Sequence, residues 1–263
     1  MFHGIKTIGL TQTSASADSG LTYLIDHVND IDDLIAFVYP DLASDARMFE
    51  KRAVLAMTNV GIDGINDSIP QRLPGPMHTL YGHNTIQGGS DFYTMPEQIH
   101  AVNILGIPPH DQPLKVGTMV MFIRNLNFNI NAINGRTGVI TAIHGNLMEI
   151  RLFWGGEPTI LVPRITFEGQ VSKNSTLFHR HQFPFRIAYA MTVNQSQGQT
   201  LHTVGLNFRD DPFSHGQLYV VLSRARGRQH IHCLVQPQRV LDNIAYVANV
   251  VFPALLSPTI PSV

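Results

Sequence analysis

The chain of 263 residues has only four lysines, and none of them follows a glycine. A phosphate-binding P-loop needs a lysine directly after a glycine-rich turn, followed by serine or threonine. The sequence therefore excludes a nucleotide-binding site of the P-loop type. Gly88-Gly89 has neither a strand before it nor a helix after it, and we predict a turn there.

Cysteine is almost absent. Cys233 is the only one, which excludes an internal disulfide and any cysteine-rich metal site. His230 and His232 stand close to it, but neighbouring residues of a strand face opposite sides, and Cys233 lies in an apolar run. We predict no metal site.

Long apolar runs are also missing. The N-terminus lacks the apolar core of a signal peptide, and the apolar tail at 244–256 is too short for a membrane span and contains Pro253. We expect an intracellular protein, nuclear in a eukaryote, with no membrane partner.

Charge is unevenly distributed along the chain. Residues 1–112 carry 13 acidic and 5 basic side chains, whereas residues 113–263 carry 6 acidic and 13 basic ones. Such an asymmetry favours a surface in the second part that faces a polyanion. A merely uneven surface explains the charge equally well.

The first part of the chain has the pattern of an α/β protein. Apolar residues at helical spacing predict a helix over 21–40, ended by Pro40. Ala53–Met57 reads as a buried strand, and Thr58-Asn59 offers the N-cap of a following helix. Residues 70–112, dense in Pro, Gly and His, read as an irregular connector.

Short strands dominate the middle of the chain. Four runs separated by glycine-containing turns predict strands at 114–123, 138–144, 147–153 and 159–162. Such a series predicts a small barrel of SH3 type, inserted into the α/β layer. Buried strands at Ile187–Met191 and Leu218–Leu222 then return to that layer.

Two segments near the C-terminus carry the most specific pattern. They are Phe185–Leu201, which contains Thr-Val-Asn-Gln-Ser-Gln-Gly, and Gly216–Arg228, which contains Leu-Ser-Arg-Ala-Arg. They resemble the last two motifs of RecD-like, superfamily-one DNA helicases, most closely the Pif-type helicases, including those of Helitron transposons. The resemblance covers roughly residues 20–235 and implies roles in DNA repair, recombination and telomere maintenance.

The resemblance implies a domain division. Residues 1–50 would be a connector with an acidic helix, and 51–100 with 178–245 would form the second RecA-like motor domain. Residues 101–177 would be the inserted SH3-like module, and 246–263 a C-terminal tail.

The resemblance also implies roles for the residues of the first segment. Thr192 and Asn194 would lie near DNA, and Gln197 with Gly198 near the nucleotide, so that the loop couples ATP to the grip on DNA. Gln195 stands where the family has lysine, and a charge-assisted contact is lost there. We expect lysine at this position to raise coupled activity.

Arg224 would be the arginine finger, which reaches the γ-phosphate of ATP held by the other motor domain. ATP and Mg²⁺ would be held mainly by that first domain, which this sequence lacks, and not by this chain alone. A truncated gene model or a decayed transposon copy would account for its absence.

Further residues would contact the phosphates of single-stranded DNA. Thr58 and Asn59 lie at a strand-to-helix junction, where backbone N–H groups and the helix dipole attract phosphate, although helix capping explains them as well. In the inserted module the contacts would be Lys115, Arg124, Asn125 and Arg136. Hairpin chemistry alone also accounts for the Asn-Gly and Thr-Gly pairs there.

Three functions agree with the sequence. The first is the C-terminal part of an ATP-dependent 5′–3′ DNA helicase, inactive alone. The second is a stand-alone module that binds single-stranded nucleic acid. The third is a protein that completes the ATPase of another polypeptide in trans.

Overall fold

The computed structural model describes residues 7–11, 23–42, 49–86, 99–100, 104, 106–153, 156, 158–170, 177–214, 216–241, 244–248 and 250. The chain divides into two compact units. Unit 1 comprises Met1–Asp41, Lys51–Gly64 and Ala190–Val263, and unit 2 comprises Leu42–Glu50 and Ile65–Tyr189. The domain division expected from the sequence stays a prediction.

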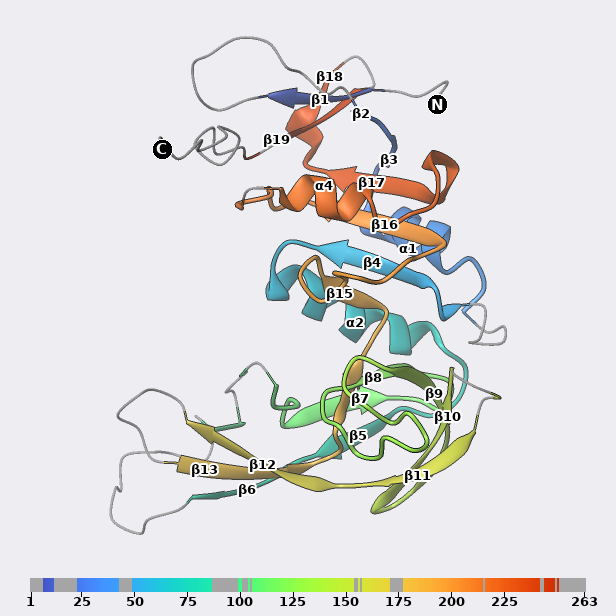
Figure 1. Cartoon of the computed structure of the whole chain (residues 1–263), viewed down its shortest axis with the longest axis vertical. Helices are drawn as coiled ribbons and strands as arrows, with labels where there is room; N and C mark the ends of the chain where they lie inside the picture. The colour runs from blue at the N-terminus through green and yellow to red at the C-terminus, as the bar shows by residue number, and fades with distance from the viewer. Residues whose placement is uncertain are drawn as a thin grey trace, which may run out of the picture. The chain divides into compact units, whose positions relative to one another are not determined.

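Unit 1 is built on a parallel sheet of five strands (Figure 1). All of its strand pairs are parallel. β16 lies third in the order and is buried along its whole length, as expected for a strand covered on both faces. The strands, in spatial order, are β15 (Ala190–Thr192), β4 (Arg52–Ala56), β16 (Thr203–Phe208), β17 (Ile231–Val235) and β3 (Asp26–Val28).

The helix expected over 21–40 is shorter than predicted. Residues 23–28 form β2 (Tyr23–Leu24) and β3, and α1 spans Ile31–Val38. Pairing with β17 keeps residues 26–28 extended, and the Asp30 carboxylate starts the helix by accepting from the Asp33 backbone N–H at 2.8 Å. α1 packs on β16, where a Cβ on Gly205 would lie 2.8 Å from Val38 Cγ2.

Two other helices flank the sheet. α2 (Asn59–Arg72) follows β4 as predicted. The strand predicted at Leu218–Leu222 is wrong, because the segment forms α4 (Gln217–Leu222). Leu218 and Val221 are buried three residues apart, which is a helical spacing, and Gly216 precedes them with φ of 74°.

Short elements complete unit 1. η2 (Arg228–His230) and η3 (Pro237–Arg239) flank β17, and a second sheet has the order β18-β19-β1-β2. Its remaining strands are β18 (Val240–Leu241), β19 (Ile244–Ala248) and β1 (Thr7–Thr11). No helix of the described residues is long and apolar enough to cross a membrane.

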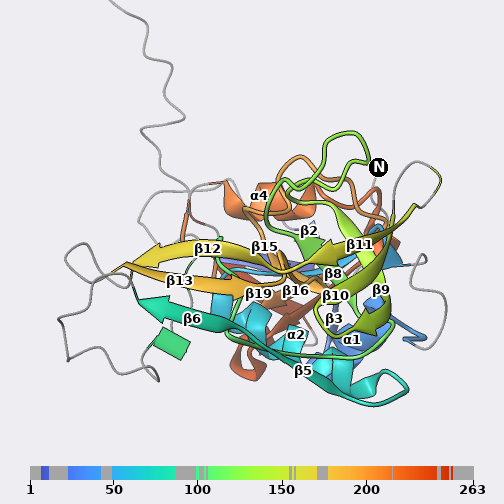
Figure 2. The same cartoon turned by 90° about the horizontal axis from the view of Figure 1, so that it is seen from below.

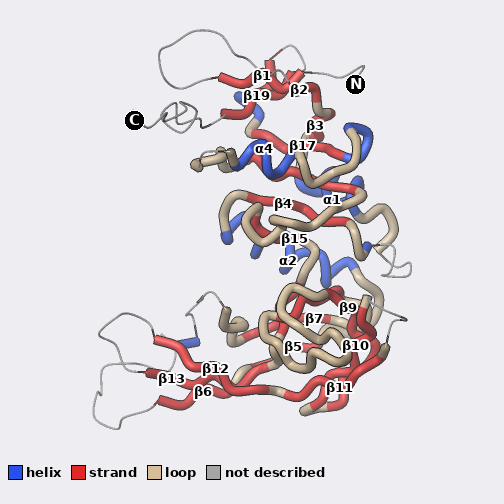
Figure 3. Tube along the Cα trace, viewed as in Figure 1, coloured by secondary structure: helices blue, strands red, loops and turns tan. Residues whose placement is uncertain are grey.

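Unit 2 consists mainly of strands and loops (Figure 3). Its largest sheet is antiparallel, with the order β11-β10-β9-β8-β14. A second sheet has the order β12-β13-β6, and β5 pairs with β7. The strands are β5 (His78–Tyr81), β6 (His83–Ile86), β7 (Asp111–Leu114), β8 (Met119–Phe122), β9 (Thr137–His144), β10 (Leu147–Leu152), β11 (Thr159–Pro163), β12 (Ile165–Gln170), β13 (Leu177–Gln182) and β14 (Phe185–Ile187).

The four strands predicted in the middle of the chain correspond to β8–β11, but they do not close into a barrel among the described residues. β8 pairs on its outer side with β14, and β13 pairs with β6. Both partners come from outside the expected module at 101–177. The 70–112 segment is also less irregular than predicted, since it contains β5, β6 and the start of β7; Gly88-Gly89 lies outside the described residues.

Candidate functional site

The carboxyl end of the parallel sheet in unit 1 gathers several of the expected site residues. Thr58 follows β4, and Thr192 ends the neighbouring strand β15; Asp210, which was not among the expected residues, follows β16. In open α/β sheets this edge is where ligands bind.

The Thr58 hydroxyl donates to Asp210 Oδ2 at 2.7 Å and accepts from the Gly61 backbone N–H at 3.2 Å. Thr58 is therefore the N-cap of α2, as the capping explanation required. Asn59 is exposed at the first turn of that helix.

The loop after β15 is fixed by a reciprocal pair of hydrogen bonds. The Gln195 N–H donates to Thr192 Oγ1 at 3.2 Å, and the Thr192 N–H donates to Gln195 Oε1 at 3.0 Å. This reciprocal pair has the bonding pattern of a capping box, with threonine and with glutamine three residues later, although here it closes a turn at 193–198 and not a helix. Gln195 acts here as an acceptor, a role that a lysine side chain cannot fill.

The same loop exposes the side chains expected to meet ligands. Val193 and Ser196 are buried, and Ser196 Oγ donates to the Val193 carbonyl at 2.7 Å. Asn194, Gln197 and Gly198 are exposed, and Gly198 has a φ of 82°. One side of the loop is thus packed in the protein, and the other side is exposed to solvent.

We expect Gln195→Lys to destabilise this loop, contrary to what charge alone suggests. Loss of a capping interaction costs about 0.5–2 kcal/mol. Gln195→Glu should retain stability, because its carboxylate can accept the same bond. Denaturant unfolding monitored by hydrogen exchange of residues 192–199 measures the difference; equal protection in the Lys and Glu variants would contradict the capping role.

Arg224 connects α4 to this loop. Its Nε donates to the Val220 carbonyl at 3.0 Å, and its Nη1 lies 3.1 Å from the Gln199 carbonyl and 3.5 Å from that of Ser196. Nη2 donates to Ser223 Oγ at 3.0 Å. The two C-terminal motifs are therefore joined through one guanidinium.

The expected contacts of unit 2 have different surroundings. Lys115 Nζ donates to the carbonyls of Leu73 at 2.6 Å and Gln71 at 3.2 Å, where a cation stabilises the C-terminal end of α2. Arg124 is exposed, with its guanidinium 5.4 Å from the centre of the Phe167 ring.

Asn125 and Arg136 belong to the base of the loop that follows β8. Asn125 Oδ1 accepts from the Asn134 N–H at 2.9 Å, and the Arg136 carbonyl accepts from the Phe122 N–H at 2.8 Å. The structure thus places Arg124, Asn125 and Arg136 at the base of one loop, whereas Lys115 caps a helix.

Sequence reasoning missed the acidic pair after β16. Asp211 forms a bidentate ion pair with Arg239, with Nη2 at 2.6 Å from Oδ2, and this hydrogen bonding raises the pKa of the Arg239 guanidinium. The signal was available, since Asp210-Asp211-Pro ends an apolar run at the carboxyl edge of the sheet. Among the described residues, no cluster of His, Cys, Asp and Glu could hold a metal ion.

Comparison with known protein families gives one match, to the 2B domain of the DNA helicase Pif1, over residues 97–143. The chain is 34% identical to the human ATP-dependent DNA helicase PIF1 over 124 residues, which is 46% of the chain and 19% of the relative. The Xenopus laevis helicase of that name is 28% identical over 185 residues, 69% of the chain and 27% of the relative. The chain thus spans about a fifth to a quarter of these proteins.

Solved structures give the same likeness. The Bacteroides Pif1 helicase, crystallised with ADP-AlF3 and single-stranded DNA, superimposes with a TM-score of 0.56 at 20% identity, covering 86% of this chain and 48% of that one. The Candida albicans Pif1 helicase gives a TM-score of 0.55 at 22% identity, covering 80% and 51%. The fold is therefore similar to that of part of these helicases.

Proposed function

Because this chain is Pif1-like, matching part of the Pif1-type DNA helicases in sequence and in fold, we propose that it supplies the C-terminal portion of an ATP-dependent 5′–3′ DNA helicase. It contributes the second RecA-like domain, while the P-loop half holds ATP and Mg²⁺. Arg224 is the arginine finger, and Gln197 with Gly198 faces the nucleotide. The DNA contacts of unit 1 are Thr58, Asn59, Thr192 and Asn194, and those of unit 2 are Lys115, Arg124, Asn125 and Arg136.

The observation that carries this proposal is the link between Arg224 and the loop 196–199. A motor must convert a change at the nucleotide into a change at the DNA. The Arg224 side chain binds the carbonyl of Ser196, two residues after Asn194, and that of Gln199, and so provides a direct physical connection for that purpose. Charge on the transferring phosphoryl group would draw the guanidinium away from these carbonyls.

A second candidate function is a stand-alone module that binds single-stranded nucleic acid. It is favoured by the excess of basic over acidic side chains in residues 113–263 and by Gln195 at a position where the family carries a charge. Both candidates require affinity for single-stranded DNA. Only the helicase requires the arginine finger.

We expect the isolated chain to bind single-stranded DNA with an affinity that falls steeply with salt. If four phosphates are neutralised, counterion release predicts a loss of about fiftyfold between roughly 50 and 200 mM salt. Fluorescence anisotropy with a labelled oligonucleotide measures this slope. A flat response would contradict a DNA track in either candidate function.

A further inference from the structure

The solvent face of the sheet β12-β13-β6 carries three histidines. These strands lie side by side (Figure 2), and successive side chains of β13 alternate between the two faces. His179 and His181 face outward, whereas Phe178, Arg180 and Gln182 are buried. His181 pairs with His83 on β6, so three imidazoles share one face.

Beside these rings lies a hollow of about 480 Å³. This lies within the range of ligand pockets, about 300–1,000 Å³. Arg124 lines it from the loop after β8. The other lining residues are Thr85, Thr166, Glu168 and His179.

Neighbouring side chains hold two of the rings by their edges. His179 Nε2 lies 3.5 Å from Glu168 Oε1, and His181 Nδ1 lies 3.3 Å from Thr166 Oγ1. Behind the sheet the buried Arg180 guanidinium binds Asn84 Oδ1 and the Pro108 carbonyl, each at 3.0 Å. Hydrogen bonds on both faces of the sheet therefore hold the strands that present the histidines.

We propose that this histidine face (His83, His179 and His181, with the hollow and Arg124) binds consecutive bases of single-stranded nucleic acid. Flat imidazole rings stack on unpaired bases, and an exposed guanidinium binds a phosphate. A duplex hides the faces of its bases, so the ligand is single-stranded. This inference deepens the function proposed above and rests on it.

The charge of the hollow agrees with such a ligand. Arg124 supplies a cationic guanidinium, and Glu168 is the only acidic side chain among the described residues that line the hollow. The Glu168 carboxylate contacts His179 and is mostly exposed, so that solvent screens its repulsion of a phosphate.

The test compares two oligonucleotides of equal charge by fluorescence anisotropy, using the full chain at low salt. One is oligothymidylate, and the other has the same length but consists of abasic sites. The double variant His179→Ala/His181→Ala should bind oligothymidylate about fivefold or more weakly, because each base loses its stacking partner. Its affinity for the abasic strand should change little.

The chain provides a matched control. His144 Nε2 lies 3.6 Å from Glu149 Oε2 on the five-stranded sheet of unit 2, so His144→Ala removes a similar His–Glu contact outside the face. It should leave both affinities unchanged. Glu168→Gln should tighten binding by about twofold, whereas Glu149→Gln should have no effect.

Every result of the anisotropy experiment either supports or contradicts the proposed histidine face. Unchanged binding by the double variant, or an equal loss with both oligonucleotides, would overturn the histidine face while leaving the proposed function intact, since the unvaried chain still binds. Failure of the unvaried chain to bind either strand would overturn both.

Discussion

Replacing Arg224 by alanine should lower ATP turnover about a thousandfold or more in a chimaera in which this chain replaces the matching part of a Pif1-type helicase. The guanidinium would neutralise charge that develops only in the transition state, so its removal affects turnover more than binding. DNA affinity should remain close to that of the unvaried chimaera. Steady-state ATPase assays and anisotropy measure the two quantities.

Two further variants separate the finger from a general basic patch. Arg226→Ala removes an exposed arginine two residues away and should leave turnover nearly unchanged. Asn194→Ala should do the reverse of Arg224→Ala and weaken the grip on DNA more than basal hydrolysis. If Arg224→Ala instead lost DNA affinity and kept turnover, the finger assignment would be wrong.

Replacing Arg180 by leucine should destabilise unit 2 by about 3 kcal/mol or more. Arg180 is fully buried, and burial lowers the pKa of its guanidinium. It donates to Asn84 Oδ1 and to the carbonyls of Pro108 and Ile99. Each buried acceptor left without a donor costs about 1–3 kcal/mol.

Denaturant unfolding of the chain measures this loss. The control is Arg124→Leu, which removes an exposed arginine of the same unit and should change stability by less than about 1 kcal/mol. An equal, small effect of both substitutions would show that the contacts of Arg180 do not stabilise the unit.

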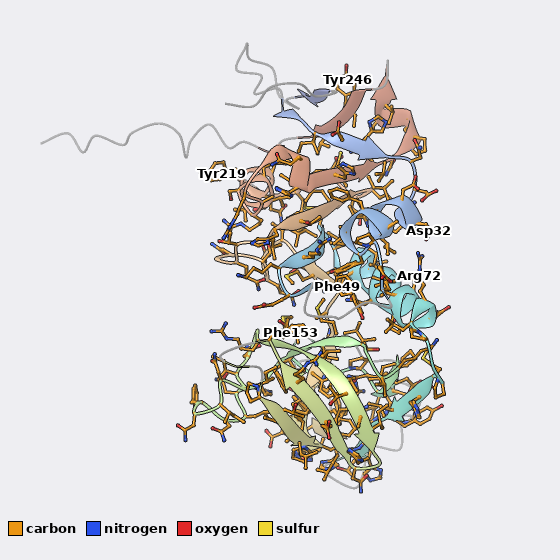
Figure 4. The ribbon with its side chains drawn as sticks, turned by 90° about the vertical axis from the view of Figure 1, so that its right-hand side faces the viewer. Asp32, Phe49, Arg72, Phe153, Tyr219 and Tyr246 are labelled. Carbon is orange, nitrogen blue, oxygen red and sulfur yellow. The ribbon has the colours of Figure 1, made fainter. Side chains whose placement is uncertain are left out.

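The α/β class could be predicted because β4, α2 and the strands β8–β11 have strong local patterns. α4 could not, because Leu-Tyr-Val-Val-Leu favours a strand by composition. Tertiary packing decides there: Leu218 is buried, while Tyr219 is 70% exposed and projects from the helix (Figure 4). Gly216, whose backbone is in the left-handed conformation just before α4, is a local indication that a new element begins there.

The three-stranded sheet was missed for a different reason. β6 has one apolar residue, and β12 has only Ile165 and Phe167 in alternation with polar residues, so that neither contains an apolar run. The pairing of β13 with β6 joins residues 92 to 98 positions apart and leaves little trace in local sequence. The same non-local pairing leaves the expected barrel open.

The residues of the candidate site could be identified from their sequence motif, but the contacts between them could not be predicted. The sequence identified Gln195 as a missing charge, although Thr-x-x-Gln is also the signature of a capping box. The bonds from Arg224 to the loop carbonyls could not be foreseen, because they depend on how α4 meets that loop.

The most direct test of the proposed function is the ATP turnover of the chimaera with and without single-stranded DNA. If this chain supplies the coupling loop and the arginine finger, DNA should stimulate turnover, and the chain alone should give none. A chimaera that folds and binds DNA but hydrolyses ATP at the same rate with and without it would contradict the proposed function.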